Sequence, residues 1–283
     1  MINRFTKTII ILMLIAAVAA CSFKTVYNRL DYLIPEYVEG MVTLDEVLEE
    51  QVEERTLMLL QWHRNTQLKQ YAGWLQSLQQ DVGVTMTEEV LEQRISEMEE
   101  FWLYLSIKLN DEMAYLLPLL DEDQQEELFI YIEDTNEEFR DEFVDLDEQE
   151  RIDDFSERIS DTYENWIGEL SDDQQLAAEQ AAAQLISTAE SRLQRRLEWQ
   201  QGIRNILVEQ GTVQYKSERL RSFLAGFEQD KDGPIKEASD INRQIIIRLT
   251  VQISHSMSDE QKEFFIRKTS DYIRMFTELA ENR

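Results

Sequence analysis

Residues 91–118 read LEQRISEMEEFWLYLSIKLNDEMAYLLP, and this stretch decides the fold class. Its large apolar side chains recur every three or four residues, which is the spacing of one face of an α-helix. Pro118 ends the pattern, because proline lacks an amide proton and clashes with the preceding helical turn. The stripe consists of Leu91, Ile95, Met98, Trp102, Leu105, Leu109, Met113 and Leu116. The stretch therefore predicts a long amphipathic helix.

The same spacing recurs outward from this stretch in both directions. The whole sequence has only 8 glycines and 3 prolines, and no strand-like alternation extends beyond a few residues. We expect an all-α protein, a multi-helix bundle or helical array of about seven to nine helices. Residues 172–209 would form one helix of about 57 Å unless Gly202 breaks it.

Four predicted helix starts share one local pattern, a capping residue followed three positions later by Glu or Gln. The pattern occurs at 121–124, 147–150, 171–174 and 258–261. It is typical of a capping box, in which the two side chains satisfy two backbone amide groups. Residues 170–174 and 257–261 also resemble the Leu-Thr-x-x-Gln signature of small periplasmic stress chaperones, which are much shorter chains. We interpret all four patterns as helix caps.

The first twenty residues have the organisation of a bacterial lipoprotein signal peptide. Arg4 and Lys7 give a positive start, and residues 9–20 form an uncharged apolar stretch. This stretch is shorter than an ordinary membrane span of about 20 residues. Residues 18–21, Val-Ala-Ala-Cys, resemble the lipobox, in which small residues precede a cysteine that receives lipid. We expect cleavage directly before Cys21 and attachment to the lipid bilayer through the acylated Cys21.

This interpretation gives a domain organisation and a location. We expect a lipoprotein signal peptide over 1–20, a lipidated N-terminus with a short aromatic segment over 21–42, and a single acidic all-helical domain over 43–283. Weak internal similarity leaves open that this domain consists of two related halves. Ser22 stands where an aspartate commonly signals retention in the inner membrane. We therefore expect an anchor in the outer membrane, with the domain on its periplasmic face.

The charge of the chain excludes some partners. The formal net charge is −29, and removal of Arg4 and Lys7 with the signal peptide would make it −31. Nucleic acid is excluded as a partner, because it needs a basic surface. Basic proteins, cationic peptides and divalent cations stay open.

The sequence contains no motif for catalysis, a cofactor or a metal. It has two isolated histidines, His63 and His255, and its single cysteine is assigned to lipid. Residues 228–235 partly match a calcium loop, but Ser239 stands where the pattern needs a bidentate Glu, so we expect a plain turn. We expect no enzyme activity, no cofactor and no metal.

One set of residues resembles a known family. The most specific part is Trp62-His63-Arg64, and the set also includes Tyr27-Asn28, Asp31, Tyr37-Val38, Leu44-Asp45, Gln67-Leu68, Tyr71-Ala72, Leu75 and residues 136–140. These residues look like an uncharacterised proteobacterial lipoprotein family whose domain has no assigned function. The resemblance implies a lipid-anchored helical domain and no activity. The strong acidity departs from the family pattern.

Two interpretations of Trp62, His63, Arg64 and Tyr71 stay open. On a helix His63 shares a face with Leu60, which favours a half-buried, hydrogen-bonded ring. Alternatively, these four residues form a partner-binding surface, because aromatic residues beside an arginine are typical interface anchors. We expect a protein-binding or scaffolding component of the cell envelope with an unknown envelope protein as partner. The alternative is a periplasmic chaperone-like client binder.

Overall fold

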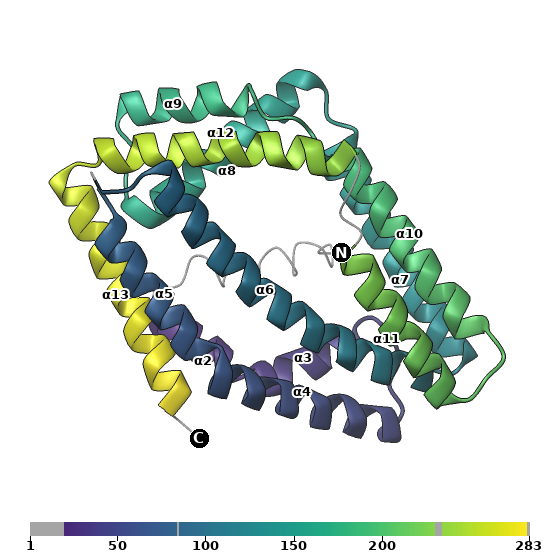
Figure 1. Cartoon of the computed structure of the whole chain (residues 1–283). Coiled ribbons are helices and arrows are strands. Elements are labelled where there is room, and N and C mark those ends of the chain that lie inside the picture. The colour runs from purple at the N-terminus through teal and green to yellow at the C-terminus, as the bar shows by residue number, and fades with distance from the viewer. Residues whose placement is uncertain (1–19, 84, 230–233, 282–283) are drawn as a thin grey trace, which may run out of the picture. The chain divides into compact units, whose positions relative to one another are not determined.

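The computed structural model describes residues 20–83, 85–229 and 234–281, in which all regular elements are helical (Figure 1). Twelve α-helices lie in these residues, with a short 3-10 helix (η1) after α6 and a π-helical turn (η2) after α7. The elements are α2 Ala20–Tyr27, α3 Leu30–Glu39, α4 Glu46–Thr66, α5 Leu68–Asp81, α6 Glu88–Leu116, η1 Leu117–Leu119, α7 Glu122–Phe139, η2 Arg140–Val144, α8 Glu148–Ile167, α9 Asp172–Ala182, α10 Ala189–Val208, α11 Val213–Gln229, α12 Pro234–Ser256 and α13 Asp259–Glu281.

The predicted all-α class is confirmed, and the predicted number of helices was too low. Two of the additional helices, α2 and α3, lie in the segment for which the sequence suggested only an aromatic stretch. Another arises because residues 172–209 form two helices, separated at 183–188. The Asn242 side chain donates to the Ile186 carbonyl at 2.7 Å and accepts from the Ile186 amide at 2.9 Å. This tertiary contact holds the backbone out of a helix.

Gly202 does not break α10. It is a position where a neighbouring helix packs closely. A Cβ built on Gly202 would lie 2.1 Å from Cζ of Phe223 in α11, so the glycine leaves room for that ring. Helix α10 continues through the glycine and packs against α11.

We expect Gly202→Ala to lower the free energy of unfolding by about 1–2 kcal/mol. Displacing the Phe223 ring outweighs the roughly 1 kcal/mol by which alanine favours a helix. The control is Gly226→Ala in α11, where nothing lies within 4 Å of the added Cβ and stability should rise by about 0.5–1 kcal/mol. Urea unfolding measures both variants, and equal stabilisation of the two would show that Phe223 does not need this space.

The described residues form two compact units. The first unit consists of residues 20–40, 44–77 and 267–281, and the second of residues 41–43 and 78–266 apart from the gaps. In the first unit α3 packs along α4. Its buried core is formed by Tyr27, Leu68, Met275 and Leu279.

The second unit contains three groups of buried apolar residues. Helix α9 packs against both α8 and α12 (Figure 1), and the core there includes Ile167, Ala177 and Phe265. The C-terminal part of α6 packs against α11, which also packs against α10 around Leu207 and Leu220. The N-terminal part of α6 packs against α12, with Leu91 and Ile247 buried.

All four predicted capping boxes form. In each, the N-cap side chain accepts from the third residue of the helix, whose side chain accepts from the N-cap amide. Two of these boxes also contact each other through their glutamines, Gln174 and Gln261. The local pattern that suggested helix caps therefore also contributes to tertiary packing.

Among the described helices, none combines the length and the apolar character that a membrane crossing requires. Residues 1–19 of the predicted signal peptide lie outside the described part of the chain. Its last residue, Ala20, is the first residue of α2. Cys21 is the second residue of α2.

Candidate functional site

His63 lies between two tyrosine hydroxyl groups in the first unit. Its Nδ1 is 2.8 Å from the hydroxyl of Tyr27, the last residue of α2, and its Nε2 is 3.4 Å from the hydroxyl of Tyr71 in α5. Tyr27 is buried, and His63 and Tyr71 are half-buried. A neutral imidazole has one donor and one acceptor, and a phenol can take either role, so both ring nitrogens find partners.

Burial favours the neutral forms of His63, Tyr27 and Tyr71. It lowers the pKa of His63 from 6.5 to about 4 and raises the pKa of Tyr27 to about 12, since a charge in this place would lose its hydration. Burial also raises the pKa of Tyr71. His63 is therefore uncharged at neutral pH. This arrangement confirms the predicted half-buried, hydrogen-bonded histidine.

Arg64 points from α4 to the same N-terminal segment. Its guanidinium donates to the Asn28 side-chain oxygen at 3.0 Å, and its carbon Cζ lies 5.1 Å from the centre of the Tyr27 ring. Trp62 is half-buried, and its ring centre is 6.3 Å from that of His63. His63 and Arg64 of the Trp-His-Arg motif thus contact the end of α2, and Trp62 packs beside His63.

A second set of contacts joins α2 to α13. The Phe23 ring is 6.1 Å from the ring of Phe276, edge to face, and Lys24 forms an ion pair with Glu278 at 2.6 Å. Helix α2 is therefore held on one side by α4 and on another by α13. The segment that directly follows Cys21 is part of the folded unit.

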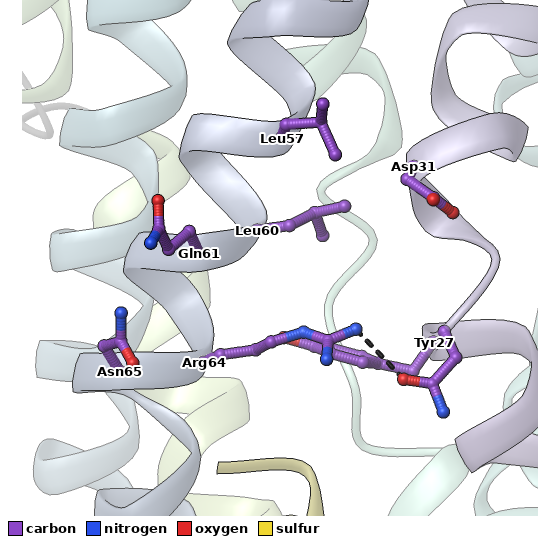
Figure 2. Close-up of a pocket in the computed structure, with 8 residues that line it drawn as sticks. Tyr27, Asp31, Leu57, Leu60, Gln61, Arg64 and Asn65 are labelled. Carbon is purple, nitrogen blue, oxygen red and sulfur yellow. Dashed lines mark hydrogen bonds between the residues drawn. The ribbon is translucent and has the colours of Figure 1, made fainter. Parts of the chain in front are cut away.

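An open groove lies between α4 on one side and the end of α2 and the start of α3 on the other (Figure 2). Its volume is about 570 Å³. Leu57, Leu60 and Arg64 point from α4 toward α2 and α3, where Asp31 stands opposite. Leu57 is 55% exposed, although it is a large apolar residue. The groove is lined by Tyr27, Asn28, Asp31, Leu57, Leu60, Gln61, Arg64 and Asn65.

The sequence indicated only part of this groove. Of the four candidate partner-binding residues, Arg64 lines the groove, whereas Trp62, His63 and Tyr71 do not. That the four residues bind a partner stays a prediction. Leu57 and Leu60 were missed as groove residues, although with Arg64 they follow the spacing of one helix face.

The described residues contain no group of three or more His, Cys, Asp or Glu side chains placed to hold a metal ion. The calcium-like loop suggested at 228–235 includes residues 230–233, which lie outside the described residues. Lipidation of Cys21 stays a prediction.

The fold and this site define an all-helical domain in which His63 and Arg64 hold the end of helix α2. The chain belongs to the Family of unknown function (DUF6279), which matches residues 40–232. This confirms the resemblance to an uncharacterised domain family. No curated protein and no solved structure matches the chain.

Proposed function

We propose that this chain is a lipid-anchored helical protein of the cell envelope that binds a partner protein through the groove beside Arg64. The observation that carries the proposal is the position of that groove. One side of it is formed by the first helices after the predicted lipidation site, with Asn28 and Asp31 only a few residues after Cys21. A partner held there would be held close to the bilayer, because no long tether separates Cys21 from the groove.

The composition of the groove suits a protein partner. Leu57 and Leu60 give it an apolar wall, and Asp31 and Arg64 give it charges of both signs. The Arg64 guanidinium is already oriented by Asn28 and by the Tyr27 ring, which reduces the entropy lost when a partner binds. An apolar centre with a polar rim is the usual composition of a protein interface.

A chaperone-like client binder is the second candidate. It is favoured by large apolar side chains that are exposed in the middle of α6, such as Trp102 and Tyr104. A scaffold would have one stoichiometric partner at the groove, whereas a client binder would contact many unrelated chains.

We expect photo-crosslinking amino acids at Leu57 and Asp31, placed in the full chain in cells, to capture one dominant envelope protein. Lys69, which is exposed on α5 outside the groove lining, is the control and should give no such adduct. Metabolic labelling with palmitate should mark the chain and should fail in Cys21→Ser, together with the adduct. Mass spectrometry identifies the captured proteins.

Each other outcome contradicts the proposal. Many unrelated proteins at Leu57 and Asp31 would identify a client binder. A labelled, lipidated chain without adducts at either position would show that the groove is not a binding site.

A further inference from the structure

The middle of α6 exposes an unusual number of large apolar side chains. Their exposed fractions range from 36% at Leu109 to 60% at Trp102. We call this set the α6 surface, and it consists of Met98, Trp102, Leu103, Tyr104, Ile107 and Leu109. Folded monomers seldom leave this many large apolar side chains of one helix segment in water unless something binds them.

The ends of α6 are buried while its middle is not. Leu91 near the start packs with Ile247 of α12, and Ala114 near the end packs with Leu220 of α11. Between them, Ser106 is the one residue of 98–109 that is fully buried. The two packed ends therefore hold the α6 surface in a fixed position.

The apolar residues are not confined to one stripe. At 100° per residue, Met98, Trp102 and Leu109 fall on one side of the helix, whereas Leu103 and Ile107 fall on nearly the opposite side. A helix that is apolar on more than one side is normally buried on more than one side. A single segment that packs along the helix would cover the side that carries Met98, Trp102 and Leu109.

The charges around the α6 surface favour a basic partner. Helix α6 contains eight acidic and two basic residues, and the whole chain has a net charge of −29. Of the two bases, Arg94 is already bound to Asp81 at 2.7 Å and to Glu97 at 2.8 Å. A second copy of this acidic chain and an anionic bilayer would both be repelled.

We propose that the α6 surface binds a cationic amphipathic segment of another polypeptide. The apolar face of that segment would cover Trp102 and its neighbours, and its Lys or Arg side chains would lie near exposed acids such as Glu100. This mode of recognition places an amphipathic helix against an apolar surface with opposite charge at the rim. The surface lies in the second unit and does not depend on the groove of the first unit.

The test uses the lipidated full chain in phosphatidylcholine nanodiscs and a labelled helical peptide with leucines on one face and lysines on the other. We expect fluorescence anisotropy to show binding that weakens with salt and is absent with empty nanodiscs. Trp102→Ala should raise the dissociation constant about tenfold or more, because buried tryptophans dominate such interfaces. Leu176→Ala, which removes an apolar side chain that is 51% exposed on α9, should change it less than about twofold. Circular dichroism should show that both variants keep their helix content.

Three results would overturn the proposal. Equal binding of a peptide with glutamates in place of the lysines would remove the charge argument. Binding to phosphatidylglycerol vesicles that Trp102→Ala abolishes would make the occupant a lipid surface. Self-association in sedimentation experiments that Trp102→Ala abolishes would make it a second copy. Leu57→Ala should leave peptide binding unchanged, so failure at the groove and failure at α6 can be told apart.

Discussion

Replacing Gln261 by leucine is expected to lower the free energy of unfolding by about 3 kcal/mol. Gln261 is 8% exposed and Gln174 is 2% exposed, and their amide groups bond to each other in both directions, at 2.8 and 3.1 Å. Each glutamine also completes the capping box of its own helix, α13 for Gln261 and α9 for Gln174. Gln261 donates in addition to the Glu169 carbonyl at 2.8 Å.

The size of this effect follows from what the leucine leaves behind. The Gln174 amide loses its two buried bonds with Gln261 and keeps those with the Ser171 amide and the Ser256 hydroxyl, which costs about 1–2 kcal/mol, and the Ser258 amide loses its cap, which costs about 1 kcal/mol. When Gln174 is replaced by leucine as well, no buried amide of the pair is left that has lost a bond. The double variant should therefore lose about 1–2 kcal/mol less than the sum of the two single variants.

The matched control is Glu150→Ala at the start of α8. Glu150 completes a capping box in the same way, but it is exposed and has no buried amide partner. We expect a loss of about 1 kcal/mol there. Urea unfolding of the natural chain and of these four variants gives the comparison. If Gln261→Leu costs no more than Glu150→Ala, the paired glutamines contribute nothing beyond their caps.

The features that the sequence predicted well are local ones. Helix periodicity and capping boxes depend on residues three or four positions apart, so the helix starts at Glu122, Glu148, Asp172 and Asp259 follow from the sequence alone. The bond between Gln174 and Gln261 joins residues far apart in the chain, and no local pattern indicates it. The break at 183–188 was missed for the same reason, because it depends on Asn242.

The candidate site shows the same division. The helix face of His63 predicted a half-buried ring, and the structure confirms it. Its partner Tyr27 lies in a segment where helix α2 was not expected, so the hydrogen bond could not be predicted. In α6 the periodicity gave the helix correctly, but an apolar stripe does not tell which part of it another element covers. Trp102 is exposed because α11 and α12 reach only the two ends of α6.

Acidification is expected to destabilise the folded chain through His63 between about pH 6.5 and pH 4. The pKa of His63 is about 4 in the folded state, below its ordinary value of 6.5, because the ring is buried. As the pH falls through 6.5 the unfolded chain takes up a proton, while the folded chain keeps a neutral ring. Stability contributed by the neutral, hydrogen-bonded ring is therefore complete above pH 6.5 and is lost as the pH approaches 4. Below pH 4 both states are protonated and the loss stops growing.

The expected size is about 2 kcal/mol. The difference between the two pKa values corresponds to about 3 kcal/mol, and solvent screening of a half-buried ring reduces it. The many carboxylates also titrate in this range, so the measurement is the difference in unfolding free energy between the natural chain and His63→Gln at each pH. Glutamine keeps a donor and an acceptor but cannot be protonated. The difference should be constant above pH 7 and should shift by about 2 kcal/mol against the natural chain by pH 4. A constant difference over the whole range, or an NMR titration of the folded His63 ring with a midpoint near 6.5, would mean that this ring is open to water and that the Tyr27 hydroxyl does not hold it in a buried place.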